Sequence, residues 1–258
     1  MSAAAPYDVR ATASELAAFF AGSDAGDGYA ARKRTAGAAS MELAQAWAKV
    51  RFAVQDAHAV LDWGCRDGVF AWLARRELGE AAALWGCDIL PPEAHGDTHR
   101  RIGLQYAPLA HPWQLPYADA SFDLVLAGGV LEHVPNEVQS LTELWRVLRH
   151  GGRLVITHLP NATSLSEWVA RRFWPGHAHA RRYRPGQIRD QLLRVGFLPL
   201  RWGCHQVLPV APPDPVARPG LAALLQRVQP FNHALEKLWP LNRLSTTLWI
   251  VAEKRLGF

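Results

Sequence analysis

The amino-acid sequence predicts an α/β fold, in which a doubly wound and mostly parallel sheet carries helices on both faces. Short apolar runs that suit strands alternate with longer amphipathic runs that suit helices from residue 59 onward. One strand run, FDLVLAG at 122–128, is apolar almost throughout, as in strands buried on both faces of a parallel sheet. The chain has 258 residues, which fits one large α/β domain or one domain with an insertion, and 49% of them are hydrophobic, which is enough for a continuous core.

Two helices are predicted before the alternating region, at residues 12–20 and 40–55. Apolar side chains recur at helical spacing in the second, and Ser40 is its expected N-cap. The segment between them, residues 21–37, is glycine-rich and polar. We expect it to be mobile.

The alternating region then runs to the end of the chain. Its predicted strands are residues 59–63, 83–89, 122–128, 153–159 and 246–254. Its predicted helices are a run over 68–78 stopped by Gly79, one capped by Asn136 and ended by Gly151, and one over 186–195 ended by Gly196. A proline-rich stretch, 208–220, introduces an amphipathic helix at about 221–239, which we interpret as an insertion before the last strand.

These elements predict a division of the chain into three regions. Residues 1–55 are expected to form an N-terminal helical cap or lid, and residues 56–207 a cofactor-binding core. Residues 208–258 would supply the proline-rich linker, a helix and the closing strand of the same domain.

Composition restricts the class of protein. The formal net charge is +5 and the pI near 9.4, which suits an acidic ligand, a membrane surface or RNA without choosing among them. The chain has three cysteines, Cys65, Cys87 and Cys204, and they form no CxxC pair. We therefore expect neither a disulfide framework nor a metal site, and we expect a protein of a reducing compartment. The N-terminus lacks the pattern of a signal peptide, and no run of about 18 apolar residues is present. We therefore expect a cytoplasmic protein that is at most peripheral to a membrane.

The stretch LDWGCRDGVF, residues 61–70, joins a predicted strand to a predicted helix through a glycine turn. A dinucleotide loop would need G-x-G-x-x-G, but the second and third glycine positions hold Arg66 and Val69. A P-loop is excluded because the chain contains no Gly-Lys-Ser or Gly-Lys-Thr. A pyrophosphate cofactor is therefore not expected.

The remaining pattern is D-x-G-x-x-x-G with a second acid at the end of the next strand. Asp88 stands 26 residues after Asp62 (88 minus 62), where a carboxylate can accept both hydroxyls of a ribose. The N-terminus of the helix after Gly68 offers free N–H groups to a carboxylate. A ribose, a carboxylate and no pyrophosphate describe S-adenosyl-L-methionine (SAM).

Four blocks, in this order, resemble the class I SAM-dependent methyltransferases, within the broad small-molecule and lipid group that includes the ubiquinone/menaquinone type. They are VLDWGCRDG (60–68), GCDI (86–89), QLPYADASFDLVLAGGVLEHV (114–134) and LTELWRVLRHGGRLVITHLP (141–160). A weaker fifth block, LLRVGFLPL (192–200), extends the resemblance to residue 200. The resemblance implies a Rossmann-like sheet of seven strands, SAM as cofactor and methyl transfer as the activity. It says much less about the acceptor.

The resemblance also implies which residues bind SAM. In its terms Asp62, Gly64 and Gly68 form the loop under the methionine part, Asp88 binds the ribose and Ile89 packs on the adenine. The whole implied set is Asp62, Gly64, Cys65, Arg66, Gly68, Asp88, Ile89, His111, Pro112, Trp113, Ala127 and Gly128. Small residues at the last two positions would let the sulfonium lie against the backbone.

Two positions depart from the family pattern. Arg66 replaces the usual middle glycine: either its backbone avoids positive φ and its side chain turns to solvent, or its guanidinium pairs with the carboxylate of SAM. We favour the solvent or outer-surface position. His111 stands where the family commonly has an acid, so the adenine amino group would meet an imidazole or only the adjacent backbone.

His133, in the block LEHVP, is the best-placed candidate for a general base, because it follows the turn that should cradle the sulfonium. The alternative is that it only holds its loop by a hydrogen bond. His158, His177 and His179 are weaker candidates, the last two in a loop that could reach over the pocket.

The stretch 165–184 interleaves aromatic residues with arginines. It could grip an acidic substrate, a lipid headgroup or an anionic membrane, or it could be a solvated cap over the sheet. RNA is disfavoured because no RNA-binding motif accompanies it.

We therefore expect methyl transfer to a small or lipid-like acceptor, at oxygen with carbon as the alternative. The rivals are an RNA methyltransferase and a subunit that binds SAM without catalysis. The oligomeric state is not predicted.

Overall fold

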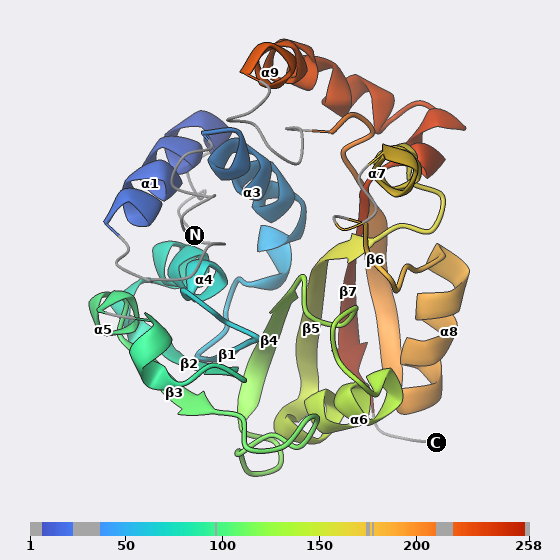
Figure 1. Ribbon diagram of the computed structural model, residues 1–258. Coiled ribbons are helices and arrows are strands. Elements are labelled where there is room, and N and C mark those ends of the chain that lie inside the picture. Colours follow the sequence, from blue (N-terminus) through green and yellow to red (C-terminus); the bar gives the residue numbers. More distant parts are fainter. Residues whose placement is uncertain are drawn as a thin grey trace.

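The computed structural model describes residues 7–22, 37–95, 97–173, 176, 178–209 and 219–255. A seven-stranded sheet crosses the molecule in the order β3-β2-β1-β4-β5-β7-β6 (Figure 1). The pairs from β3 to β5 are parallel, and β7 runs antiparallel to both of its neighbours. The strands are β1 (Ala59–Trp63), β2 (Ala83–Asp88), β3 (Leu104–Pro108), β4 (Phe122–Gly128), β5 (Leu148–Pro160), β6 (Phe197–His205) and β7 (Thr247–Lys254). This confirms the predicted doubly wound, mostly parallel sheet.

Helices cover both faces of the sheet (Figure 1). They are α1 (Val9–Ala21), α3 (Gly37–Val50), α4 (Val69–Leu78), α5 (Thr98–Arg101), α6 (Glu137–Val147), α7 (Leu165–Phe173), α8 (Pro185–Val195) and α9 (Pro219–Leu235). Helices α1, α3 and α4 share one hydrophobic core with the sheet, and α6 and α8 share the other. Among the residues that the structure describes, no helix is both long and apolar enough to cross a membrane.

The two cores explain why these segments fold as they do. On one face Phe20, Trp47 and Phe70 are buried together against the first strands. On the other, Leu144 and Ile188 are buried against β4 and β5. Each fully buried side chain of this size contributes about 1.5–3 kcal/mol relative to an exposed one. The cap helices and the strands therefore share one core, while the three-region division of the chain stays a prediction.

Several predicted helix boundaries are confirmed. Helix α4 ends at Gly79 (φ 70°) and α8 at Gly196 (φ 100°), two left-handed backbone positions that glycine adopts without strain. Helix α6 is capped as expected, because the Asn136 side chain accepts a hydrogen bond from the Gln139 N–H at 3.1 Å.

Two other boundaries were predicted wrongly. Ser40 is not an N-cap but lies buried inside α3, which begins at Gly37 and ends at Val50. Helix α6 ends at Val147 rather than at Gly151, because Leu148 is buried and pairs with Phe122 of β4. Sheet pairing and burial at Leu148 outweigh the glycine signal, and Gly151 lies within β5.

The remaining differences concern strands and segments at the edges. Strands β3 and β6 were not predicted, since both lie at sheet edges and expose residues that break the apolar pattern. The predicted helix over 221–239 is observed as α9, which ends at Leu235. Most of the segment expected to be mobile, and residues 210–218 of the proline-rich stretch, lie outside the described residues.

The topology positions the site. Chain order reverses between β1 and β4, which are neighbours in the sheet, while β2 and β3 lie on the other side of β1. In open α/β sheets ligands bind beyond the carboxyl ends of the strands at this switch point. The carboxyl ends of β1, β2 and β4 therefore define the expected site.

Candidate functional site

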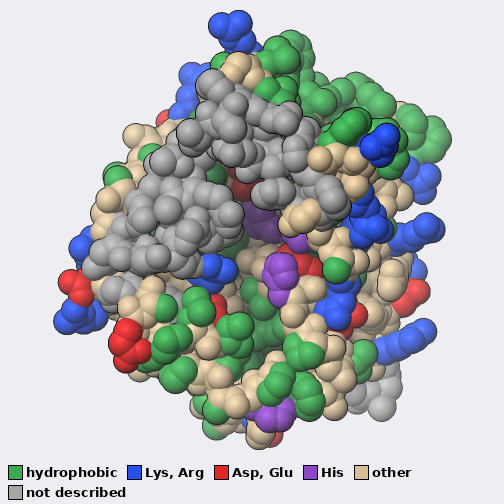
Figure 2. Space-filling model, in the orientation of Figure 1, with side chains coloured by type: hydrophobic (Ala, Val, Ile, Leu, Met, Phe, Trp, Pro, Cys, Tyr) green, Lys and Arg blue, Asp and Glu red, His purple; other side chains and the backbone are tan. Residues whose placement is uncertain are grey.

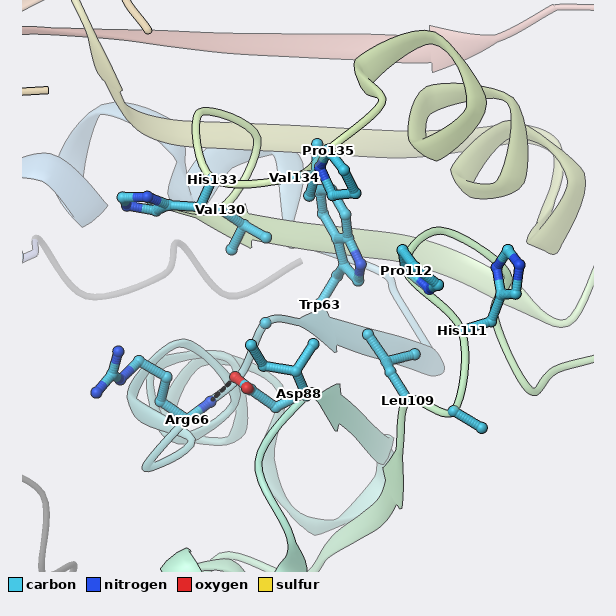
Figure 3. Close-up of a pocket in the computed structure, with 14 residues that line it drawn as sticks. Trp63, Arg66, Asp88, Leu109, His111, Pro112, Val130, His133, Val134 and Pro135 are labelled. Atoms are coloured by element: carbon cyan, nitrogen blue, oxygen red, sulfur yellow. Dashed lines mark hydrogen bonds between the residues drawn. The ribbon is translucent and has the colours of Figure 1, made fainter. Parts of the chain in front are cut away.

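A cavity of about 570 Å³ lies at the carboxyl ends of β1, β2 and β4 (Figure 3). Its volume falls within the usual range for a small-molecule site. Its lining residues are Trp63, Gly64, Arg66, Asp88, Ile89, Leu109, Ala110, His111, Pro112, Gly129, Val130, His133, Val134 and Pro135. Seven of the thirteen predicted site residues are thus brought together around one space.

The glycine turn after β1 forms one wall of the cavity. Gly64 has φ 68°, and a Cβ there would lie 2.5 Å from a methyl group of Val130. Gly68 has φ 78°, and a Cβ there would lie 2.7 Å from the Cδ1 of Ile102. Both positions therefore exclude any side chain, and the turn packs against its neighbours by its backbone.

Asp62 and Cys65 lie beneath the turn and do not line the cavity. The Asp62 carboxylate accepts a hydrogen bond from the Ala71 N–H of α4 at 2.9 Å, which joins the strand to the helix. Burial raises the pKa of the Cys65 thiol well above its usual value, so this cysteine is a packed, protonated group. Both residues shape the turn from below.

Arg66 lies at the tip of the turn and lines the cavity. Its φ is 45°, so the expectation that its backbone avoids positive φ is wrong: the turn requires the glycine-like conformation whatever residue occupies it. Its backbone N–H donates to the Asp88 carboxylate at 3.0 Å. Figure 3 shows the guanidinium at the end of the cavity opposite to Leu109 and His111.

Asp88, the last residue of β2, is 6% exposed and faces the cavity. Its two carboxylate oxygens accept hydrogen bonds from the N–H groups of Arg66, at 3.0 Å, and Leu90, at 3.2 Å. A carboxylate has about four lone-pair positions, so it keeps capacity for further donors. Two hydroxyl groups of a ligand can therefore bind here.

The opposite end of the cavity is largely apolar. Ile89 is 75% exposed beside Leu109 and Pro112, which gives a planar ring an apolar surface to pack on. The Nδ1 atom of His111 accepts from the Gln114 N–H at 3.2 Å. The neutral imidazole then carries its proton on Nε2 and donates, so it cannot accept from the amino group of an adenine. Trp113 does not line the cavity, and its ring lies edge-on to the ring of His111 at 4.5 Å.

The end of β4 supports the cavity from behind. Ala127 is buried and Gly128 does not line the cavity, but a Cβ at Gly128 would lie 2.0 Å from the Phe70 ring. Gly129, with φ 69°, lines the cavity instead. The predicted contact of Ala127 and Gly128 with the sulfonium stays a prediction, and Gly129, the second glycine of LAGGV, is the glycine of this turn that reaches the cavity.

Seven lining residues were missed by sequence reasoning. They are Trp63, Leu109, Ala110, Gly129, Val130, Val134 and Pro135. Most of them directly adjoin a predicted residue in the chain. Their position next to a motif was therefore the only sign in the sequence that they line the cavity. They contribute shape and apolar surface to it rather than a charge that could be recognised in the sequence.

His133 lines the cavity from the loop between β4 and α6, and its side chain is 67% exposed. Burial, together with the positive charges of His179 and Arg66, lowers the pKa of His133 below its usual value. The loop is held from outside, because Arg181 donates to the Val134 carbonyl at 2.6 Å and Tyr183 to the Leu131 carbonyl at 3.2 Å. A neutral, solvent-reachable imidazole thus lies at the mouth of the cavity.

Two neighbours of His133 complete a polar cluster. Glu132 is 8% exposed, and burial raises the pKa of its carboxyl. The Nδ1 atom of His179 lies 2.6 Å from the Oε1 atom of the buried Glu167, and this hydrogen bond raises the pKa of His179. One ligand atom from each of Glu132, His133 and His179 lies within 4.8 Å of the others, and such donors can hold a divalent cation. The expectation of no metal site stays a prediction.

His158 does not line the cavity. Its Nε2 atom lies 2.9 Å from the Glu42 carboxylate of α3 and its Nδ1 atom 3.0 Å from the Thr157 hydroxyl. Both ring nitrogens are thus engaged, and Glu42 also contacts His205 of β6 at 3.1 Å. His158 therefore joins the cap to the sheet, while His177 lies outside the described residues.

The residues present fit SAM. The close approach of Val130 to Gly64 leaves a bare backbone turn for the methionine part, with the N-terminus of the ten-residue helix α4 behind it. Asp88 retains acceptor positions for a ribose, and the surface at Ile89 suits an adenine. No side chain of the described lining projects from Gly64 or Gly129 to block this path.

Comparison with known proteins agrees with this geometry. A family model described as "Methyltransferase domain" matches residues 61–156. A protein of Streptomyces halstedii named "Methyltransferase GfsG" is 39% identical over 115 residues, which cover 42% of this chain and 40% of that protein. A demethylmenaquinone methyltransferase of Lactiplantibacillus plantarum is 33% identical over 119 residues, 43% of this chain and 48% of that protein. The chain thus spans less than half the length of these two relatives.

Solved structures share the fold over most of the chain. A putative methyltransferase from Bacillus halodurans C-125 superposes with a TM-score of 0.58 at 15% identity, covering 82% of this chain and all of that one. The [4+2]-cyclase SpnF superposes with a TM-score of 0.55 at 20% identity, covering 85% and 83%. These similarities concern the fold alone. Taken together, the domain match and the shared fold show that residues 61–156 form a methyltransferase domain within a class I SAM-dependent methyltransferase fold.

Proposed function

We propose that this protein transfers a methyl group from SAM to a small-molecule or lipid-like acceptor, at an oxygen atom, with a carbon atom as the alternative. The observation that carries the proposal is the neutral imidazole of His133 at the mouth of the same cavity that holds the ribose-binding carboxylate of Asp88. A cofactor site and a proton acceptor face one space. Methyl transfer to a hydroxyl needs both.

Each part of the cavity has a proposed role in binding. Asp88 accepts the ribose hydroxyls, the Gly64 turn and the start of α4 hold the methionine part, and Ile89 packs on the adenine. Asp62, Cys65, Ala127 and Gly128 act from beneath, by fixing the backbone that forms the walls. When bound, SAM supplies an electrophilic methyl group. The chain supplies position, which in good cases is worth an effective molarity on the order of 10⁵ M or more.

His133 is the proposed general base. Its lowered pKa keeps it neutral at pH 7, so the imidazole can take a proton from an acceptor hydroxyl. His179, oriented by Glu167, lies with its ring centroid 6.1 Å from that of His133. Because Arg181 and Tyr183 fix the loop carbonyls, His133 keeps its position at the cavity mouth.

The names of the relatives bear on the chemistry of the acceptor. Relatives matched over the methyltransferase region include proteins named demethylmenaquinone methyltransferase and, at 34% identity over 107 residues, a malonyl-[acyl-carrier protein] O-methyltransferase of Herminiimonas arsenicoxydans. These names favour a small or lipid-like acceptor over RNA. We further propose a cytoplasmic protein that contacts the membrane peripherally through 165–184. Trp168 on this stretch is 61% exposed.

The test uses the purified chain, SAM labelled in the methyl group, and three separated fractions of acceptors: aqueous small molecules, extracted lipids and total RNA. We expect label in the small-molecule or lipid fraction, and His133→Ala should abolish most of it. Label in RNA would favour the RNA methyltransferase. SAM binding without label in any fraction would favour the non-catalytic subunit, a real alternative because a [4+2]-cyclase shares the fold.

A further inference from the structure

Helix α9 and the segment after it expose an unusual number of large apolar side chains. The set is Leu224, Phe231, Leu238, Trp239, Leu241 and Leu244, with exposed fractions between 36% and 76%. We call this set the C-terminal apolar surface. Trp239, at 76%, is the most exposed of them. Figure 2 shows hydrophobic side chains gathered over α9 at the top of the view, on the face where the molecule is hollowed.

Helix α9 is held against the rest of the chain partly by polar bonds, and several of its apolar side chains stay exposed. Its inward side is held by polar bonds: the Asn232 side chain accepts from the N–H groups of Val207 and Leu208, at 2.9 and 2.7 Å, and is 2% exposed. Glu236, one turn later, accepts from the Gln206 N–H at 2.6 Å and pairs with Lys49. Leu225, Val228 and Leu235 on the same side are half-buried, so α9 packs by a mixed side. Leu224 and Phe231 stay exposed beside it, although an amphipathic helix of a globular protein normally buries its apolar residues.

The charges beside this surface have one sign. Arg227, Lys237 and Arg243 are exposed. The only acidic residue between positions 219 and 245 is Glu236, whose side chain is 10% exposed and already paired. Helices that lie in the surface of an anionic membrane have this composition: exposed leucine, phenylalanine and tryptophan interspersed with cations that no nearby acid opposes.

The surface continues toward α7. The Arg243 carbonyl accepts from the Asn161 side chain at 3.0 Å, and Thr246 donates to the Ser166 hydroxyl at 3.0 Å. The segment after α9 is thus joined to the beginning of α7, which carries the exposed Trp168. An exposed apolar patch of this extent on a soluble domain marks an interaction site.

We propose that the C-terminal apolar surface binds an anionic lipid bilayer, with α9 lying in the plane of the headgroups. The apolar side chains enter the headgroup–acyl boundary, and Arg227, Lys237 and Arg243 contact the phosphates. The inference goes beyond the proposed methyl transfer and does not depend on it.

The experiment is co-sedimentation of the purified chain, without SAM or acceptor, with vesicles of phosphatidylcholine alone or mixed with phosphatidylglycerol. We expect binding to the anionic vesicles at least tenfold tighter, weakening as salt is raised, because each cation near the surface is worth about fivefold. Leu238→Ser with Trp239→Ser should lower binding at least tenfold. Arg227→Glu with Lys237→Glu should remove the preference for anionic vesicles.

Trp202→Ser is the matched control, since Trp202 is 54% exposed but belongs to β6. It should bind vesicles like the parent. If the Leu238/Trp239 double variant does not fold, as judged by circular dichroism, Leu224→Ser with Phe231→Ser on α9 replaces it.

Three results would overturn the proposal. They are no binding of the parent to anionic vesicles, equal binding of the parent and the apolar variants, and a parent dimer in light scattering that the apolar variants dissociate without any vesicle binding. The last result would assign the surface to a second copy of the chain. Because the assay contains no SAM, its failure leaves the proposed methyl transfer untouched.

Discussion

Replacing Asp88 with alanine removes the group that the structure presents to the ribose of SAM. In the folded chain its oxygens accept two N–H groups, from Arg66 at 3.0 Å and Leu90 at 3.2 Å. With about four lone-pair positions on a carboxylate, two remain, which matches the two hydroxyls of a ribose. A hydrogen bond to a charged group contributes about 1.5–3 kcal/mol. Losing even one therefore predicts at least a tenfold weaker affinity.

The measurement is isothermal titration calorimetry with S-adenosylhomocysteine on the parent and on Asp88→Ala. The variant also leaves the Arg66 and Leu90 N–H groups without their acceptor, at a cost of roughly 1–3 kcal/mol of stability, so a thermal melt must show that it is folded at the assay temperature. Asp190→Ala is the control, because this aspartate is exposed on α8. A dissociation constant within twofold of the parent in folded Asp88→Ala would refute the assignment.

Three further predictions concern the walls and mouth of the cavity. His133→Ala should lower kcat by about 10²-fold or more with little change in SAM affinity. The rate of the parent should fall as the pH drops through a pKa below the ordinary 6.5, and the variant should lose this part of the pH–rate profile. An unchanged pH–rate profile in the variant would leave His133 a structural role. Arg66→Gly should bind SAM at least as tightly as the parent, because glycine adopts φ 45° without strain. A loss of SAM affinity beyond about tenfold in calorimetry would show instead that the guanidinium pairs with the SAM carboxylate. Gly128→Ala should lower the free energy of unfolding in urea by about 1–3 kcal/mol, because its Cβ would lie 2.0 Å from the Phe70 ring, and a variant as stable as the parent would show that the ring can move freely.

Features that are local in the chain could be predicted from the sequence. The strands β1 and β4 were predicted with their observed bounds, and Asp88 was found at the end of β2, because a buried parallel strand and the turn after it leave a continuous signature. Asn136 and Gly196 act as helix boundary residues because capping depends only on neighbouring backbone groups.

Features that depend on contacts between distant segments could not be predicted. His179 meets Glu132 and His133 only after the chain has passed through β5 and α7, and no spacing rule links positions 133 and 179. The contact between His158 and Glu42 joins residues 116 positions apart. Pairing with β4 set the end of α6, against the local signal of Gly151.

The exposed apolar side chains of α9 are a third case. Periodicity alone predicts that the apolar side of a helix is buried. Here the inward side also holds Asn232 and Glu236, which accept hydrogen bonds from backbone N–H groups at 206–208, while Leu224 and Phe231 stay exposed. Only the tertiary structure shows which side of an amphipathic helix faces the solvent.

A structure of this chain with S-adenosylhomocysteine bound would decide whether the cavity is the SAM site. We predict that the ribose hydroxyls lie within hydrogen-bonding distance of the Asp88 carboxylate, with the adenine on Ile89 and the sulfur facing His133. A ligand bound elsewhere, or one whose ribose makes no contact with Asp88, would contradict the assignment of the cavity and the methyl transfer derived from it.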